Sequence, residues 1–213
     1  MYCRTCRGPV RAGFARCYQC DAAAGQFGGL LADVVAPIGY AVKGGQLAAD
    51  LWMYKSGQQG AAAAGARLRA VLSGYLRDHG RRVWRAAAMA GDPVLAAVVP
   101  SGQGRPGAHP LREIVQSCAG LPMAELSVRP RSAARGRVSA GWLRVDAPVA
   151  DADVLLVDDT WVSGASAQSA AAALKLAGAR RVAAVVLGRH VDPADPRSSA
   201  FLRTINDKYG QAV

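Results

Sequence analysis

Three apolar runs in the second half of the chain predict buried strands. They are "PVLAAVVP" at 93–100, "DVLLV" at 153–157 and "RRVAAVVLGRH" at 180–190. Strands of a parallel sheet are covered on both faces and therefore read as nearly continuous apolar runs. Between them, "LREIVQSCAG" at 111–120 and "GASAQSAAAALKLA" at 164–177 have the composition and spacing of helices. This alternation predicts an α/β fold, with helices flanking a parallel sheet.

The first half of the chain predicts one further pair of strands and two helices. In "LLADVVAPIGYAV" at 30–42, Pro37 and Gly39 indicate a turn between two strands. The segments 46–55 and 61–80 carry apolar residues at spacings of three and four, which is typical of helices. We expect the second of these helices to end at its last residue, a glycine.

Shorter elements complete the pattern. "MAELSV" at 123–128 and "GWLRV" at 141–145 predict short strands, and the tail at 197–210 predicts a closing helix. The Arg-rich stretch 129–141 has no apolar period. We interpret it as a mobile surface loop.

Four cysteines at the start of the chain predict a metal site. They form two CxxC pairs separated by ten residues, at Cys3, Cys6, Cys17 and Cys20. Such spacing lets four thiolates surround one structural Zn²⁺, as in zinc ribbons. Two disulfides or a redox-active CxxC are the alternatives. We expect a zinc-ribbon-like module at 1–28 and one α/β domain at 29–213, with the fifth cysteine, Cys118, as a small core residue.

Charge and hydropathy indicate what kind of partner the protein binds and in which compartment it is located. The formal net charge is +11, from 26 Lys and Arg against 15 Asp and Glu. This excess indicates a polyanionic partner or a phosphorylated ligand. The sequence shows neither the apolar core of a signal peptide nor an apolar run of about 18 residues. We therefore expect a soluble cytoplasmic protein without membrane insertion, whose thiols are reduced.

An acid pair directly after a buried strand marks the candidate site. Asp158 and Asp159 follow the run at 153–157, and a serine-glycine turn at 163–166 opens the next helix. Ligands of open α/β sheets bind beyond the carboxyl ends of the strands, and a helix N-terminus favours phosphate. Adjacent carboxylates can accept hydrogen bonds from vicinal hydroxyls, and the turn beside them can bind a phosphate. A ribose 5-phosphate offers both groups. A helix cap or a solvated turn is the alternative.

Two other folds also place acids after a strand, and both fail a requirement here. A receiver domain needs its acid pair near the start of the fold, whereas only 54 residues follow Asp159. A P-loop enzyme needs GxxxxGK[ST], which the sequence does not contain. The glycine-rich stretch "SGQGRPGAHP" at 101–110 also follows a predicted strand and precedes a helix. This arrangement can direct backbone amides at phosphate oxygens.

The run "VLLVDDTWVSGAS" at 154–166 resembles the phosphoribosyl pyrophosphate (PRPP) signature of type I phosphoribosyltransferases. Together with the paired CxxC motifs, the chain is similar to the competence protein F (ComF) family, which joins a zinc ribbon to such a fold. The resemblance implies that Asp158 and Asp159 hold the ribose hydroxyls. The rest of the PRPP site would be Thr160, Trp161, Val162, Ser163, Gly164, Ala165 and Ser166.

The resemblance also implies a pyrophosphate loop and a magnesium-dependent reaction. The loop would be formed by Ser101, Gly102, Gln103, Gly104 and Arg105. Asp158, Asp159 and Arg105 would be the catalytic residues, Mg²⁺ would bind with the pyrophosphate, and 129–141 would close over the reaction. Val162 stands where enzymes acting on 6-oxopurines carry an aspartate, which argues against that activity.

Two functions follow as hypotheses. The first is a PRPP-binding phosphoribosyltransferase that transfers phosphoribosyl to an unidentified nucleophile, with a link to DNA uptake. The second is a non-catalytic competence accessory protein that binds single-stranded DNA or a DNA-uptake helicase. Its candidate contacts are Arg4, Arg7, Arg11 and Arg16, with Tyr2, Phe14 and Tyr18 for base stacking. The sequence leaves the acceptor and the oligomeric state open.

Overall fold

The computed structural model describes residues 2–101, 109–129 and 136–209. The helices are α1 Tyr18–Phe27, η1 Gly28–Leu30 (a 3₁₀ turn), α2 Gln46–Met53, α3 Ala61–Ala86, α4 Pro110–Ala119, α5 Ala165–Leu176 and α6 Pro196–Tyr209. The strands are β1 Val34–Val42, β2 Leu95–Val98, β3 Met123–Ala124, β4 Leu126–Val128, β5 Leu143–Val145, β6 Asp153–Trp161 and β7 Arg181–Val191. Among the helices of these residues, none combines the length and the apolar character that crossing a membrane requires.

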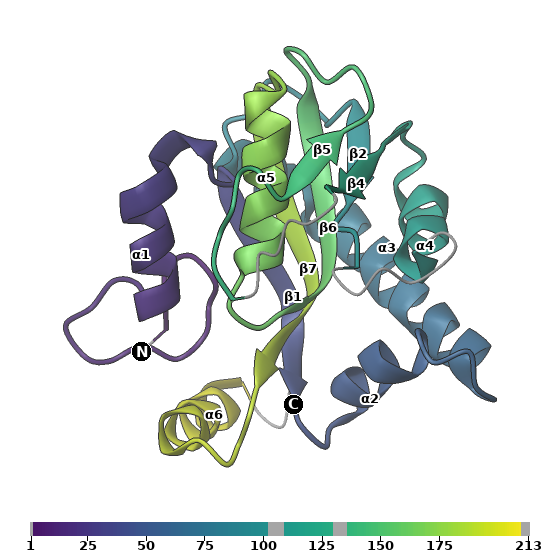
Figure 1. Cartoon of the computed structure of the whole chain (residues 1–213). Coiled ribbons are helices and arrows are strands. Elements are labelled where there is room, and N and C mark those ends of the chain that lie inside the picture. The colour runs from purple at the N-terminus through teal and green to yellow at the C-terminus, as the bar shows by residue number, and fades with distance from the viewer. Residues whose placement is uncertain (1, 102–108, 130–135, 210–213) are drawn as a thin grey trace.

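The predicted parallel sheet is confirmed. Within the described residues it has five strands in the order β1-β7-β6-β2-β3, and every pair is parallel. Figure 1 shows α5 on one face and α3 and α4 on the other. The connection from β6 through α5 leads toward β1, whereas the connection from β2 through α4 leads toward β3. The topological switch point of the sheet therefore lies between β6 and β2.

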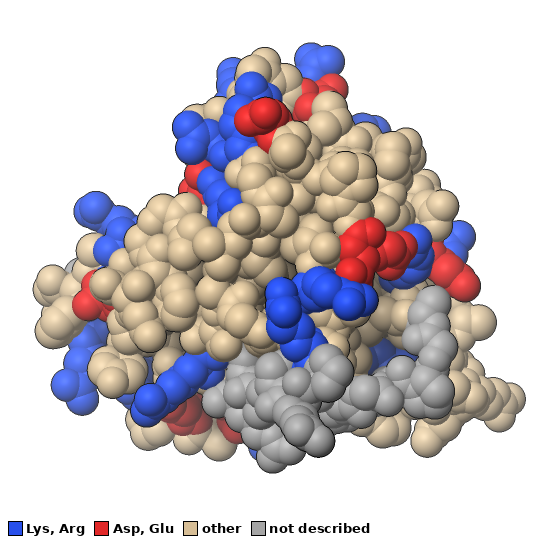
Figure 2. Space-filling model, turned by 45° about the horizontal axis from the view of Figure 1, so that its top comes forward, with Lys and Arg blue, Asp and Glu red and all other residues tan. Residues whose placement is uncertain are grey.

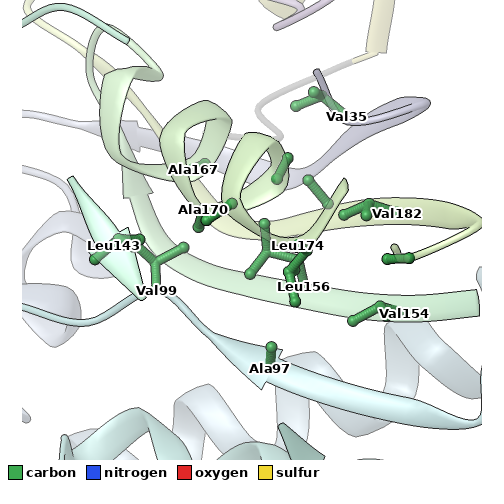
Figure 3. Packing of buried hydrophobic residues seen from close by; sticks show 14 of the residues in the cluster. Val35, Ala97, Val99, Leu143, Val154, Leu156, Ala167, Ala170, Leu174 and Val182 are labelled. Carbon is green, nitrogen blue, oxygen red and sulfur yellow. The ribbon is translucent and has the colours of Figure 1, made fainter. Parts of the chain in front are cut away.

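Strand β6 divides its side chains between two hydrophobic clusters. Val154 and Leu156 belong to the cluster under α5, whereas Leu155 and Val157 belong to the cluster under α2, α3 and α4. All four are fully buried, as expected for a central strand whose successive residues point to opposite faces. Figure 3 shows the first cluster. Its α5 members include Ala167, Ala170 and Leu174.

The prediction of a strand, a turn and a second strand at 30–42 is wrong. The chain forms one continuous strand, β1, that runs through Pro37 and Gly39. This strand lies at the edge of the sheet and pairs only with β7 among the described strands. An edge strand tolerates proline, because one side of its backbone needs no partner strand.

The predicted end of the second helix is also wrong. Helix α3 continues through Gly80 to Ala86. Gly80 is buried, and a Cβ added there would lie 3.4 Å from Cζ2 of Trp84. The indole of Trp84, one turn further along the same helix, packs beside Gly80, and this packing outweighs the poor helix propensity of glycine.

Two strand boundaries differ from the prediction as well. The segment 123–128 divides into β3, which joins the main sheet, and β4, which pairs antiparallel with β5 in a separate ribbon. Strand β6 does not end before the acid pair but continues through it to Trp161. The acids are therefore held in extended backbone rather than in a loop.

Helix α2 reaches the sheet through a glycine. A Cβ added at Gly188 of β7 would lie 2.5 Å from Cδ1 of Leu51 and 2.8 Å from Cβ of Ala41. The missing side chain lets α2 pack directly on β7 and β1. This contact fixes the end of α2, from which Tyr54 and Lys55 extend toward the carboxyl ends of the strands.

Candidate functional site

The acid pair lies in an open pocket at the topological switch point. The pocket has a volume of about 890 Å³ and is lined by the ends of β2 and β6, the end of α2 and the starts of α4 and α5. Of the residues singled out from the sequence, it brings together Ser101, Asp158, Asp159, Thr160, Val162 and Ser166. Crevices at this place in open α/β sheets are the usual ligand sites.

Asp159 is held by three side chains from the α2 to α4 side of the sheet. The Tyr54 hydroxyl donates a hydrogen bond of 2.6 Å to Oδ2 of Asp159, and Lys55 forms an ion pair with the same oxygen. Nε2 of His109 lies 3.8 Å from it. His109 also caps α4, because its Nδ1 accepts a hydrogen bond of 3.2 Å from the backbone N–H of Leu111. All three of these side chains contact Oδ2 of Asp159.

Asp158 has a different environment. One of its oxygens accepts a hydrogen bond of 2.9 Å from the backbone N–H of Asp159. Burial, reinforced by the neighbouring charge of Asp159, raises the pKa of Asp158 well above its ordinary value. Burial also raises the pKa of Asp159, but the Lys55 charge and the hydrogen bonds from Lys55 and Tyr54 outweigh it and lower that pKa below the ordinary value. At any given pH, Asp159 is therefore the more readily ionised carboxyl of the pair, and Asp158 is the more readily protonated one.

The turn after β6 depends on one glycine. Gly164 has a φ of +82°, and a Cβ added there would lie 2.0 Å from Cζ2 of Trp161. The indole of Trp161 is only 1% exposed and belongs to the cluster under α5. The indole of Trp161 thus packs against Gly164 and supports the turn. It does not line the larger pocket.

The residues of the predicted phosphate turn divide between two cavities. Val162 and Ser166 line the larger pocket with the acids. Ser163 and Gly164 line a second cavity of about 270 Å³ that faces the N-terminal module. Ala165 is buried, and its backbone N–H donates a hydrogen bond of 3.3 Å to Oγ of Ser163.

Parts of two predicted loops lie outside the described residues. In the predicted pyrophosphate loop these are Gly102, Gln103, Gly104 and Arg105, and in the predicted closing loop they are 130–135. Of the remainder, Ser101 lines the larger pocket, and Nε of Arg129 donates a hydrogen bond of 3.2 Å to the carbonyl of Leu143. The described part 136–141 has no helix or strand, and the N–H of Ser139 donates to Oγ of Ser169 on α5 at 2.8 Å.

The sequence analysis missed Tyr54, Lys55 and His109. Tyr54 and Lys55 are the last two residues of the helix predicted at 46–55, whereas α2 ends at Met53, and nothing local indicates that its end lies at the acid pair. His109 lies in the stretch 101–110 that was proposed for phosphate. The only local signal was its place before Pro110, since proline is common at the first position of a helix.

The four N-terminal cysteines converge as predicted. Their Sγ atoms all lie within 4.8 Å of one another, and Cys3, Cys6 and Cys20 are buried. The second CxxC pair leads into α1, which starts at Tyr18. All five cysteines of the chain are free thiols, so the disulfide alternative is not what the structure contains.

The geometry of the cluster fits a tetrahedral metal. Sγ of Cys6 and Sγ of Cys17 are 3.8 Å apart. Four sulfurs placed 2.3 Å from a central Zn²⁺ would be separated by about 3.8 Å. The cluster could therefore hold one structural Zn²⁺.

Comparison with known proteins finds similarity in fold only. No family model and no curated protein matches the chain. Among solved structures, PRPP synthetase from Mycobacterium smegmatis is 22% identical over 61% of this chain, with a TM-score of 0.38, and the match spans 36% of the synthetase. Adenine phosphoribosyltransferase from Leishmania tarentolae is 14% identical over 70% of this chain and 66% of its own, with a TM-score of 0.40.

Orotate phosphoribosyltransferase of Mycobacterium tuberculosis H37Rv, solved in complex with PRPP, is also similar. It is 22% identical over 68% of this chain and 82% of its own, with a TM-score of 0.32. Scores of this size carry no argument about activity. The function has to follow from the chain's own residues.

The buried acid pair predicts an unusual dependence of stability on pH. Because the folded state raises the pKa of Asp158, the unfolded chain loses this proton first as pH rises above about 4. The free energy of unfolding should then fall by up to about 1.4 kcal/mol per pH unit until the folded carboxyl ionises. Asp158→Asn has no titrating group at this position, so its free energy of unfolding should not fall in this way. We therefore expect the variant to be more stable than the wild type at pH 7 to 8.

Denaturant unfolding of both proteins between pH 4 and 8 measures the difference. It should shrink toward zero near pH 4, where the carboxyl is protonated in both states. Asp92→Asn, which changes an exposed aspartate, is the matched control. An Asp158→Asn variant whose stability relative to the wild type is the same at every pH would contradict the proposed protonation of the pair.

The cysteine cluster predicts one bound zinc ion. Elemental analysis of the purified protein should give about one Zn²⁺ per chain, and Cys17→Ser should lower it strongly, because a tetrahedral site loses a ligand. Removal by a chelator should lower the melting temperature, since structural zinc contributes on the order of 10 kcal/mol to small modules. Cys118→Ser, outside the cluster, should keep the wild-type zinc content. Equal zinc loss in both variants would refute the assignment.

Proposed function

We propose that this chain binds PRPP with Mg²⁺ and transfers its phosphoribosyl group to a nucleophile, releasing pyrophosphate. The observation that carries the proposal is the convergence of Asp158, Asp159, Val162 and Ser166 in one open pocket at the topological switch point. These residues belong to the run that resembles the PRPP signature. We further propose that residues 1–28 form a zinc-bearing module ahead of this domain, as in the ComF family.

The two carboxyls offer complementary partners to a ribose. Asp159 is ionised, and its Oδ1 can accept a hydrogen bond from a hydroxyl. The raised pKa of Asp158 lets it keep its proton to a higher pH than an ordinary carboxyl, and in that form it can both donate and accept. Vicinal hydroxyls of a ribose, each a donor and an acceptor, match this pair. One negative charge rather than two also reduces repulsion toward a phosphorylated ligand.

Positive groups around the acids suit the phosphates of the ligand. Lys55 lines the same pocket, and the backbone amides at the start of α5 favour an anion. Ser101 to Arg105 would receive the pyrophosphate. Mg²⁺ bound with the pyrophosphate would neutralise the charge that develops on the leaving group. The protein's own contribution is then to orient the ribose and to stabilise charge, with little acid-base chemistry.

Two large apolar side chains that line the pocket are exposed to solvent. Trp52 is 62% exposed and Val162 is 61% exposed, and both line the pocket. Exposed large apolar side chains at a pocket mouth are typical of ligand contacts. We propose that the nucleophile binds beside Trp52 and Val162. Because residue 162 is a valine, no carboxylate at this position takes part in recognising the nucleophile.

Calorimetric titration with PRPP and Mg²⁺ tests the proposal. We expect saturable binding by the wild type, and Asp159→Asn should weaken it by about 10- to 100-fold, because a charge-assisted hydrogen bond of about 1.5 to 3 kcal/mol is lost. Asp92→Asn should bind as the wild type does. Absence of binding by the zinc-loaded wild type at millimolar PRPP would reject the proposal. If PRPP binds, product analysis with a panel of bases, nucleotides and amines would identify the nucleophile.

A second candidate function is the binding of single-stranded nucleic acid by the N-terminal module. Arg4, Arg7, Arg11 and Arg16 are all exposed. The aromatic residues Tyr2, Phe14 and Tyr18 are 53%, 63% and 83% exposed. Exposed aromatics among arginines are the usual elements of a base-stacking surface. Elsewhere, on the face shown in Figure 2, Lys and Arg occur in separate groups rather than in one continuous stripe.

Fluorescence anisotropy with a labelled oligonucleotide distinguishes this function from PRPP binding. Changing the four arginines of the module to glutamine should reduce the salt dependence, by about 0.7 in the log–log slope for each phosphate that the module no longer neutralises. Tyr18→Ala should weaken binding at all salt concentrations, since stacking is worth about 1 to 3 kcal/mol per base. Arg81 and Arg85 on α3, changed to glutamine, are the control. Equal effects of both arginine sets would exclude the module as a specific site.

A further inference from the structure

Arg189 holds the backbone at the end of β6. It lies on β7 opposite Trp161. Its Nη1 donates to the carbonyl oxygens of His190 at 2.7 Å, Trp161 at 2.9 Å and Val162 at 3.1 Å. Trp161 is the last residue of β6, and at Val162 the chain turns toward α5. One guanidinium group therefore fixes the start of the turn whose residues line the ligand pocket.

The other side of the same guanidinium lies against the cysteine module. A Cβ added at Gly8 would be 2.6 Å from Nη2 and 2.7 Å from Nε of Arg189. The carbonyl of Gly8 accepts a hydrogen bond of 2.8 Å from the N–H of Cys3, so Gly8 belongs to the turn around the first cysteine pair. The hydroxyl of Tyr40 donates to the carbonyl of Arg7 at 3.0 Å, which holds the same turn on β1.

A buried donor of the guanidinium lacks a partner in the described part of the chain. Nε of Arg189 is buried and has no hydrogen-bond partner among the described residues. A buried cationic group with an unpaired donor is costly unless an opposite charge is nearby. Four thiolates around one Zn²⁺ carry a net negative charge, and Gly8 brings Arg189 close to the cysteine turn. The loaded metal centre would thus stabilise the guanidinium where it holds the carbonyls of the turn.

We propose that Arg189 is a positioning residue that couples metal binding at the cysteine module to the order of the turn 161–164. With the metal bound, Arg189 is held between Gly8 and the turn. Without it, the guanidinium loses its counter-charge and the turn loosens. The consequence for PRPP affinity rests on the function proposed above, whereas the coupling between metal and turn does not.

Hydrogen exchange of the backbone amides at 161–168, followed by mass spectrometry, tests the coupling without any ligand. Removing zinc from the wild type with a chelator should speed exchange there by roughly 5- to 100-fold, the usual range of coupling between sites. Zinc-loaded Arg189→Met should exchange as fast as the chelated wild type, and chelation should add little more. Unchanged exchange on zinc removal from the wild type would overturn the proposal, as would a chain that binds no zinc.

Two further variants separate geometry from charge and from folding. Gly8→Ala leaves every charged group and every cysteine in place but displaces the guanidinium, so it should reproduce the effect of Arg189→Met. Gly25→Ala on α1, with no neighbouring atom within 4 Å, is the matched control and should behave as the wild type. Arg189→Lys keeps the charge without the planar fork and should not restore protection. Full rescue by lysine would overturn the role of the hydrogen bonds.

Zinc content and PRPP affinity complete the test. If Arg189→Met fails to fold, Gly8→Ala carries the measurement, because its far-UV circular dichroism and zinc content should match those of Gly25→Ala. PRPP should bind the zinc-loaded wild type several-fold more tightly than the chelated one, and PRPP should raise the equilibrium affinity for zinc, measured by competition with a chelator, by the same factor. In Gly8→Ala both effects should be reduced.

The two proposals fail in different ways. No PRPP binding by any variant, together with zinc-dependent protection of the turn, would reject the proposed function and leave the coupling intact. PRPP binding that is equal in the wild type, Arg189→Met and Gly8→Ala, with or without zinc, would reject the coupling and leave the proposed function intact.

Discussion

The burial of two adjacent carboxyl groups at the end of the central strand β6 is the constraint on which the rest of the site depends. Asp158 and Asp159 are 9% and 7% exposed, too little for water to stabilise two charges side by side. Burial therefore raises the pKa of Asp158, whereas Lys55 and Tyr54 lower the pKa of Asp159. A strand that merely ended in solvent would need none of these partners. These partners fix the position and the relative acidity of the two carboxyls.

The partners of Asp159 and the turn after it reach their places through close backbone contacts. On one face, Gly188 lets α2 pack on the sheet, and Tyr54 and Lys55 follow from the end of that helix. On the other face, Gly164 lets the turn lie directly on the indole of Trp161. In both places a side chain as small as a methyl group would collide with a neighbour. The geometry of the site is thus set by packing several residues away from the acids.

Local pattern in the sequence predicted most of the sheet and the acid pair. The apolar runs that became β2, β6 and β7 are buried on both faces, and this burial leaves a continuous signature along the chain. The cysteine cluster was predictable for a different reason, because ligand spacing follows from the geometry of the metal. Both kinds of signal depend only on residues that are near one another in sequence.

The errors arose where a distant partner decides the local structure. Pro37 does not break β1, because β1 is an edge strand, and strand order cannot be seen in a local window. Gly80 does not end α3, because Trp84 packs against it. Lys55 and His109 are separated from Asp159 by many residues and meet it only through the fold. The chemistry of the site was visible in the sequence, but the groups that set its protonation were not.

The strand order also explains why one end of the sheet can hold both halves of a ligand. Because the chain leaves β6 toward one edge and β2 toward the other, α5 and α4 start on opposite faces and open a gap between them. Asp158 and Asp159 project into this gap from its floor, with Ser101 on the β2 side and Ser166 on the α5 side. The PRPP proposed as ligand carries phosphate groups on two sides of its ribose, and in a gap of this shape the ring would lie over the acids with one phosphorylated end toward Ser101 and the other toward Ser166. The strand order, which separates the two helix starts, is therefore the physical basis of the proposal.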